Sequence, residues 1–564
     1  MKSLLNISII TFSVLLFSCN EKNNGGEKKQ SEKNGGAFSI AENTEIRSVF
    51  PLLITAQTEA LITSQMHECL VRLNPHTLDA IPGIAEKWEV SADGKTITFH
   101  LNKNARFHDD KCFPDGKGPV ITSNDVKFSL ELLSTKSDFN FQFETVLKDK
   151  LLGANDFYDK KANSLAGVKV IDESTIQILL EQPSLSFIQL LAHPAASIIS
   201  EVAYKAYGTN MKVGAGPFIY DPSSNASQCV LVKNKNYYRT DSAGCSLPYL
   251  DTVIINLFSS IEEGLTSFEN GKTDLVNTLP SLRVKDMLEK NINEFQSNPP
   301  KSILHHEPEM ISQYYTFNTK KAPFNNVKVR QAVNYAIDRE RIINNILQGQ
   351  AIASAINGIT PNTFSGYDIK SIIGYSLNIA KAKQLLAEAG YPEGKGFPET
   401  TVIVNSGNSR NSSVAVEIQK QLKENLNINI NFESLPNKQK TDLQMIGKGS
   451  IYRDAWVADY PSPETYLTLF YGSGVPSVDT IYSYPNTSRY QNKDYDTYFT
   501  KGKFANNKDT SYYYFMKAEQ QLMNDAVIIP LWYEGSYRLL TSKVKGLHLN
   551  AMRYYDLTKA YKVK

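Results

Sequence analysis

The order of helices and strands in the C-terminal half of the chain is the feature that most restricts its fold. Residues 401–405 have the pattern of an apolar strand, residues 412–426 have helical spacing, and residues 428–432 alternate like a half-buried strand. A strand, a helix and a second strand in this order favour a right-handed crossover between parallel strands. This half of the chain is therefore predicted to be an α/β unit.

Two more helices are predicted ahead of this unit. Apolar residues recur on one helical face across residues 329–347, and Gly349 ends that pattern. A further helix is expected at residues 376–390, because it stops at a glycine and Pro392 lies just beyond. Helices that carry one apolar face each are suited to covering a sheet.

The N-terminal half is predicted to be richer in strands. Residues 96–101 alternate between apolar and polar side chains, and residues 168–171 and 175–180 flank a short polar turn, which is typical of a hairpin. A helix is expected to run to Leu133 with Ser123 as its N-cap.

The first residues carry an export signal. Lys2 precedes an apolar run at residues 4–17 that is too short and too polar to span a bilayer. The run ends in Ser18 and Cys19, and this pair resembles the bacterial lipoprotein box, in which the cysteine is lipidated and begins the mature chain. Residues 1–18 are therefore predicted to be a lipoprotein signal peptide. The alternative is an ordinary signal peptide with an incidental cysteine.

The segment that follows supports an anchored protein. Residues 20–36 contain no apolar side chain, so they cannot bury enough surface to offset the entropy of ordering. Residues 19–39 are predicted to be a disordered tether. No later run of about 18 apolar residues occurs, so the body is expected to be held at the outer face of a membrane through the lipid anchor only.

Export changes the interpretation of the remaining cysteines. Four follow Cys19, an even number for an oxidising compartment. Cys229 and Cys245 lie near two predicted strands and are one candidate disulfide; Cys69 and Cys112 are the other pair by elimination. Free buried thiols remain the alternative for both pairs.

Charge and motif searches exclude several functions. Lysine and arginine total 60 against 58 acidic residues, so there is no electrostatic case for nucleic-acid binding. Residues 472–474 have the wrong spacing for a serine-nucleophile turn. His67 and Glu68 begin like a zinc-protease helix, but Val71 replaces the second histidine, and the phosphate-loop pattern ending at Thr273 lacks its first glycine. We therefore expect no catalytic residues, no metal and no cofactor.

The sequence feature that does indicate a class of protein is a series of short stretches in a fixed order. They are 82–91 (PGIAEKWEVS), 107–110 (FHDD), 122–126 (TSNDV), 214–218 (GAGPF), 248–251 (PYLD), 329–339 (VRQAVNYAIDR) and 456–461 (WVADYP). Together they resemble the family 5 extracellular solute-binding proteins, the peptide-capturing components of bacterial ABC importers. The resemblance covers roughly residues 45–555, and the insert at 111–119 departs from it.

The resemblance implies an α/β fold of two lobes around a ligand cleft, with an extra subdomain in the first lobe. The expected divisions are 40–64, 213–306 and 528–564 for the central subdomain of lobe 1, 65–212 for its extra subdomain, and 307–527 for lobe 2. The chain would cross between lobes near residues 306 and 528, and these crossings would form the hinge.

The resemblance also implies a ligand site. Asp459, three residues after Trp456, matches the aspartate that receives a peptide's α-ammonium in oligopeptide-binding relatives, and a buried ammonium needs such a partner. The alternative is a helix cap. Arg453 matches an arginine near the ligand's carboxylate, with an ion pair to Asp454 as the alternative. Trp456 and Tyr460 would line the cleft, although Tyr460 suits a core equally well.

The implied function is that of a monomeric, lipid-anchored receptor that delivers peptides to the permease and ATPase subunits of an ABC importer. Relatives hold peptides by main-chain hydrogen bonds and accept many side chains in roomy, wet pockets. The alternatives are a nickel chelate, an oligosaccharide or another solute in the same fold, and a surface-anchored hydrolase.

Overall fold

The computed structural model describes residues 35–137, 140, 142–406, 409–478 and 481–563. The predicted signal peptide, Cys19 and the first part of the expected tether lie outside these residues. Within them, no helix is long and apolar enough to cross a bilayer.

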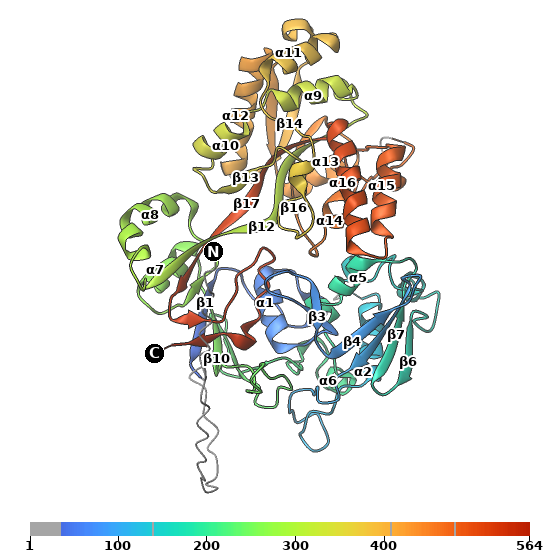
Figure 1. The fold of residues 1–564 in the computed structure, drawn as a ribbon, viewed down its shortest axis with the longest axis vertical. Coiled ribbons are helices and arrows are strands. Elements are labelled where there is room, and N and C mark those ends of the chain that lie inside the picture. Colours follow the sequence, from blue (N-terminus) through green and yellow to red (C-terminus); the bar gives the residue numbers. More distant parts are fainter. Residues whose placement is uncertain (1–34, 138–139, 141, 407–408, 479–480, 564) are drawn as a thin grey trace, which may run out of the picture.

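The chain folds into two lobes, drawn as the upper and lower bodies of Figure 1. One sheet of 11 strands extends through both lobes. Its strands, in spatial order, are β15 (Ile430–Leu435), β14 (Thr400–Asn405), β16 (Ile451–Val457), β12 (Ser302–Phe317), β17 (Ile528–Thr541), β11 (Leu275–Val276), β1 (Ala37–Glu42), β10 (Thr252–Leu257), β9 (Gln228–Lys233) and β8 (Phe218–Tyr220), while β13 (Ala351–Ser354) also pairs with β17.

Strands β12 and β17 are the long strands that connect the lobes (Figure 1). They pair antiparallel, and their register shifts between Pro308 and Ser312. In that interval the backbone N–H of Met310 donates to the carbonyl of Ala551, so the C-terminal segment occupies the place of the neighbouring strand.

The α/β unit of lobe 2 confirms the predicted strand, helix and strand. β14 and β15 are parallel, and α12 (Ser409–Leu426) connects them. The single helix predicted across residues 329–347 is wrong. Two helices are present, α9 (Val327–Tyr335) and α10 (Arg339–Asn345), because the Asp338 carboxylate accepts the backbone N–H of Arg341 and starts a new helix.

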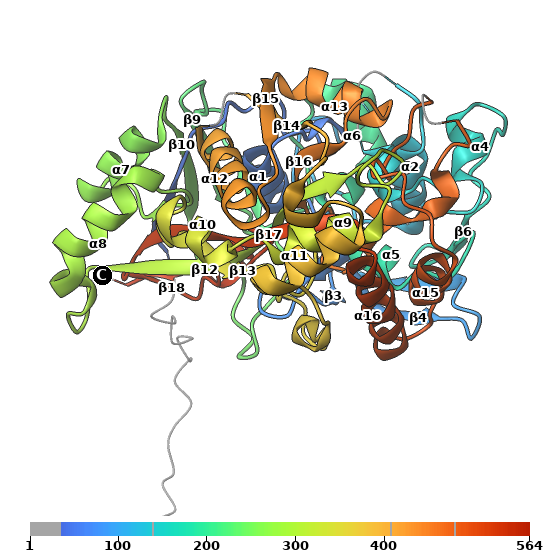
Figure 2. The ribbon, with the colours of Figure 1, turned by 90° about the horizontal axis from the view of Figure 1, so that it is seen from above.

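The remaining helices of lobe 2 include the predicted one, α11 (Ile379–Glu388), which lies inside the expected range. The others are α13 (Asn437–Met445), α14 (Glu464–Leu467), α15 (Lys493–Lys503) and α16 (Lys508–Asn524). Figure 2, seen from above, shows α9 to α12 in a group and α15 and α16 side by side beyond them.

Lobe 1 contains a separate four-stranded sheet in the order β4 (Ala85–Val90), β5 (Thr96–Leu101), β7 (Thr175–Leu179) and β6 (Val168–Asp172). The predicted hairpin is confirmed as β6–β7. Helix α2 (Ser123–Leu133) ends where predicted, but its N-cap is Thr122: the backbone N–H and the hydroxyl of Thr122 both donate to Asp125 Oδ2, at 2.8 and 2.9 Å.

The other elements of lobe 1 are short except for α8. They are α1 (Gln57–Met66), β2 (Val71–Leu73), β3 (Ala80–Pro82), α3 (Phe143–Val146), α4 (Ala154–Tyr158), α5 (Leu185–Leu190), α6 (Glu201–Tyr207), α7 (Ile261–Glu269), α8 (Ser281–Phe295), β18 (Val544–Lys545) and β19 (Tyr561–Lys562).

Apolar packing crosses the boundary between lobes. One continuous buried cluster contains Phe99 and Ile176 of the small sheet together with Tyr460 and Tyr466 of lobe 2. The lobes therefore already touch along one side, where Ser186 Oγ also donates to Glu464 Oε2 at 2.7 Å.

Two predictions need correction. Strand β1 begins at Ala37, inside the range expected to be tether, because it pairs with β10 in the main sheet. The cysteines form no disulfides in the described chain: Cys69, Cys112, Cys229 and Cys245 are free thiols. Cys229 is buried in the lobe 1 core, whereas Cys245 packs in a different apolar cluster, so the predicted pair is separated by packing.

Candidate functional site

A cavity of about 450 Å³ lies between the lobes. Lobe 1 contributes α1, β2, residues 189–194 and residues 551–554, whereas the other wall consists of residues 309–311 and 457–461. Its size is within the usual range for small-ligand sites.

Helix α1 presents one face to this cavity. Gln57, Ala60, Leu61 and Ser64 recur at helical spacing, so they lie on the same side of the helix. The start of the helix is fixed by the buried carboxylate of Glu59, which accepts backbone N–H groups of the preceding loop, including that of Thr55 at 2.7 Å. These hydrogen bonds hold the first turn of α1 against the preceding loop.

Asp459 lies just beyond the end of β16 on the opposite wall, where the sequence predicted a ligand-binding carboxylate. Its Oδ2 accepts the hydroxyl hydrogen of Thr465 at 3.1 Å. Thr465 Oγ1 also accepts the indole N–H of Trp456 at 3.1 Å, so its hydrogen is left to point at Asp459. Trp456 and Thr465 therefore position the carboxylate.

The charge of Asp459 is not neutralised by a direct ion pair. None of the ion pairs among the described residues includes it, and Lys150 of lobe 1 acts on it only as a more distant charge. The side chain is accessible to solvent within the cavity. Partial withdrawal from bulk water raises the pKa of Asp459, while the Thr465 hydrogen bond and Lys150 oppose that rise.

The expected alternative for Asp459, a helix cap, does not describe its contacts. Helix α14 has Pro463 at its N-cap position, without a side-chain capping bond. Tyr460, the next residue, is largely buried in the shared apolar cluster and also lines the cavity. Trp456 does not line the cavity and acts through Thr465.

A second charged group of the cavity is already paired. Glu309 Oε1 accepts from Arg553 Nε at 2.7 Å and from Arg538 Nη2 at 3.3 Å. Arg538 is fully buried, and Arg553 also donates to Gln57 Oε1 at 3.1 Å. This cluster connects β12, β17, α1 and the C-terminal segment at the base of the cavity.

Arg453 does not line the cavity that contains Asp459. It donates to Gln313 Oε1 and to Asn405 Oδ1, the latter at 3.2 Å. The suggested ion pair with Asp454 is absent, because Asp454 contacts Lys440 at 2.5 Å and successive residues of a strand point to opposite faces.

Sequence reasoning missed the polar network around Arg453. Gln313 Nε2 donates to Glu534 Oε2 at 2.9 Å, and Arg410 grips the same carboxylate with two nitrogens at 2.9 and 3.1 Å. Nothing in the sequence marked Arg410 or Thr465, because each reaches its partner through the tertiary fold rather than through a motif.

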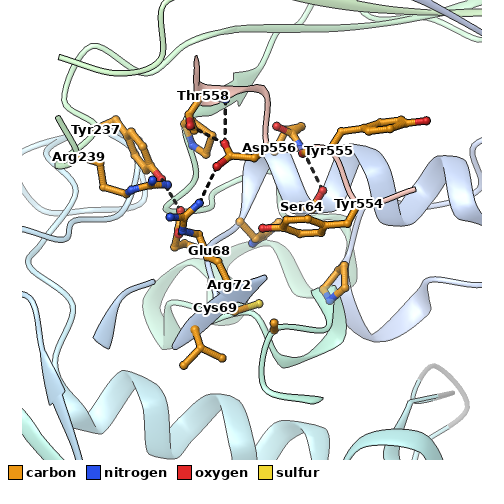
Figure 3. Close-up of a pocket in the computed structure, with 16 residues that line it drawn as sticks. Ser64, Glu68, Cys69, Arg72, Tyr237, Arg239, Tyr554, Tyr555, Asp556 and Thr558 are labelled. Carbon is orange, nitrogen blue, oxygen red and sulfur yellow. Dashed lines mark hydrogen bonds and ion pairs between the residues drawn. The ribbon is translucent and has the colours of Figure 1, made fainter. Parts of the chain in front are cut away.

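A smaller cavity of about 30 Å³ in lobe 1, drawn in Figure 3, shares the lining residues Ser64, Ala192, Pro194 and Tyr554 with the interlobe cavity. Its volume suits one water molecule. Arg72 pairs with Asp556 at 2.9 Å and lies 3.6 Å from Glu68, whose Oε2 accepts the Tyr237 hydroxyl at 2.8 Å. This network fixes the C-terminal segment beside α1, and burial raises the pKa of Glu68.

Metal chemistry receives no support from the arrangement of ligands. In the part of the chain that the structure describes, no group of three or more histidine, cysteine, aspartate or glutamate side chains is suited to hold a metal ion. The chemistry that the interlobe cavity offers is recognition: a positioned anion beside apolar walls.

Comparisons with known proteins agree with this geometry. The chain is 26% identical to the heme-binding protein A of Haemophilus influenzae, over 97% of this chain and 96% of that protein. It is 27% identical to the periplasmic oligopeptide-binding protein OppA of Salmonella typhimurium, over 89% and 88%. Each of these relatives is named as a binding protein and not as an enzyme.

Solved structures show the same fold. The unliganded open form of the murein tripeptide-binding protein MppA matches with a TM-score of 0.80 at 22% identity, covering 95% of this chain and 98% of that one. The binding protein DppA of Helicobacter pylori, in complex with the peptide STSA, matches with a TM-score of 0.71 at 25% identity, covering 94% and 99%.

The family assignment rests on the sequence match along most of the chain. Residues 79–477 match the middle region that defines the bacterial extracellular solute-binding proteins, family 5. The order of motifs, the two-lobed fold and the interlobe cavity all agree with that match. The chain belongs to the bacterial extracellular solute-binding proteins of family 5.

Proposed function

We propose that this protein is the lipid-anchored peptide receptor of an ABC importer, which captures peptides in the interlobe cleft and delivers them to a membrane permease. The observation that carries the proposal is Asp459, a positioned carboxylate without an ion pair in a cavity between lobes. In the empty protein water reaches this carboxylate, and a cation that enters the closing cleft would replace that water as its partner. The α-ammonium of a peptide is that cation.

The cleft works by differential affinity. A ligand that touches Asp459 on lobe 2 and α1 on lobe 1 is bound better by the closed arrangement than by the open one, and only this difference favours closure. The proposed divisions are 40–64, 213–306 and 528–564 for central lobe 1, 65–212 for its extra subdomain, and 307–527 for lobe 2.

Arg453 is the proposed carboxylate-binding residue for peptides that extend beyond the cavity. Its guanidinium has two neutral partners, Gln313 and Asn405, which it can exchange for a carboxylate without separating an existing ion pair. Trp456 orients Asp459 through Thr465, and Tyr460 forms part of the wall.

The cellular setting follows from the start of the chain. Lipidation at Cys19 would hold the protein at the extracytoplasmic face of the envelope, where it would act as a monomer and dock on permease and ATPase subunits. The presence of peptide-binding proteins among the relatives supports this role.

Native mass spectrometry of the purified full-length protein, followed by calorimetry with trialanine, tests the proposal. We expect co-purified intact peptides and binding of trialanine that N-acetyltrialanine does not reproduce. A co-purified nickel chelate or oligosaccharide, or equal binding of the acetylated peptide, would contradict it. Cleaved peptide products would favour a hydrolase.

A further inference from the structure

The residues next to Asp459 in the cavity wall are apolar, although the carboxylate of Asp459 has no ion-pair partner. Three apolar residues lie within two positions of Asp459 in the sequence, and two more lie on the neighbouring strand β12. They are Val457, Ala458, Pro461, Met310 and Ile311. A group that binds next to this carboxylate is therefore in contact with hydrocarbon.

Val457 is the most informative member of this wall. It is a large apolar residue with 55% of its surface exposed, and it lies two residues before Asp459. Ile311 is its direct cross-strand partner between β12 and β16, so the two side chains share one face of the sheet. Since both line the cavity, their exposed surface faces the ligand space beside Asp459.

The facing wall of lobe 1 is partly apolar. Leu61 on α1, Leu73 on β2 and Met552 in the C-terminal segment line the same cavity, together with the polar side chains of Gln57, Ser64, Gln189 and His193. Arg553 of this wall is paired with Glu309 of the opposite wall. Closure would therefore bring three apolar side chains of this wall toward the group that lies between the lobes.

Tyr484 lies near Asp459 but does not line the cavity. This residue is 55% exposed. Its pKa is raised mainly by partial burial and, to a smaller extent, by the negative charge of Asp459. Tyr482 is 58% exposed in the same segment.

We infer that this protein selects peptides whose first residue carries a large apolar side chain. This inference rests on the proposed function, and it narrows the peptides that the receptor binds to those with such a first residue. The ammonium binds Asp459, and the side chain on the adjacent carbon packs against Val457 and Ile311. A polar side chain there would lose its water without gaining a partner. This differs from the broad tolerance that the family resemblance implies.

Calorimetry with three tripeptides that differ only in their first residue tests the inference. Leu-Ala-Ala should bind at least about tenfold more tightly than Ala-Ala-Ala and than the similarly sized, polar Asn-Ala-Ala. Val457→Thr keeps the shape and the β-strand preference but replaces one methyl group by a hydroxyl, so it should reduce the preference for Leu-Ala-Ala over Asn-Ala-Ala several-fold.

The matched control is Val90→Thr, another exposed valine in a strand, on β4 and outside the cavity lining. It should leave all three affinities unchanged. Equal affinity of the unmodified protein for Leu-Ala-Ala and Asn-Ala-Ala would overturn the inference and leave the peptide-receptor function intact. If none of the three peptides binds, the proposed function itself is wrong and the inference falls with it.

Discussion

Replacing Asp459 with asparagine tests the capture site directly, because it removes the charge and keeps the shape of the side chain. In the closed cleft the ligand ammonium and this carboxylate would both leave bulk water. Removing one partner of such a pair costs about 3–5 kcal/mol, which corresponds to a loss of affinity of about 100-fold or more. Because Asp459 is accessible to water in the cavity, we expect the lower end of that range.

The empty protein should tolerate this change. Asp459 has no ion pair to lose, and an asparagine oxygen can still accept the Thr465 hydroxyl. Partial withdrawal from bulk water already disfavours the charged form of Asp459, so the melting temperature should stay within about 2 °C. Calorimetry with trialanine measures affinity and thermal unfolding measures stability. Asp286→Asn, on the exposed side of α8, is the control. Unchanged affinity of Asp459→Asn would refute the reasoning.

Four further outcomes follow from the same geometry. The pKa of Asp459 is raised, so peptide affinity should fall when the pH is lowered and this carboxylate is protonated. Affinity should also fall when the pH is raised past about 8, because the ligand amine then loses its proton. Calorimetry across pH should show the loss at high pH but not the loss at low pH in Asp459→Asn. Thr465→Val removes the positioning hydroxyl and should weaken trialanine binding about 2- to 10-fold, whereas an unchanged affinity would show that Asp459 needs no such support. Arg453→Gln should weaken binding of a pentapeptide with a free carboxylate and leave its C-amidated form unaffected, and equal losses for both would argue against carboxylate recognition. Alkylation of the unfolded, unreduced protein should label all four cysteines of the described chain, and a protected pair in the mass spectrum would contradict the free thiols.

Local patterns in the sequence predicted the local structure well. The β14–α12–β15 unit was recognisable because strand alternation and helical spacing differ in period, and the β6–β7 hairpin because a short polar turn separates two apolar runs. The helix predicted across residues 329–347 failed for an equally local reason. Periodicity runs on through Asp338, but the capping carboxylate of that residue begins a second helix.

The features of the fold and of the site that were not predicted depend on contacts between residues far apart in the sequence. No local pattern marks the contact between β12 and β17, which lie about two hundred residues apart and carry the main sheet through both lobes. The position of Asp459 was predicted by resemblance, but Thr465, which orients it, was not. The ligand role of Arg453 stays a prediction, and its partners Gln313 and Asn405 could not be inferred from its neighbours in sequence, because they come from β12 and β14.

The shift of register between Pro308 and Ser312 has a mechanical consequence. A sheet resists bending where its ladder is continuous, and the β12–β17 ladder is interrupted in this interval. Met310 is bonded there to Ala551 of the C-terminal segment and to Ala458 beyond β16, so a change in the angle between the lobes would need no β12–β17 hydrogen bond to break at this point. Glu309, Met310 and Ile311 belong to this interval, and all three line the ligand cavity. A bound ligand would therefore contact the interval at which the β12–β17 pairing is interrupted. The same three residues would then influence both the affinity for the ligand and the angle between the lobes.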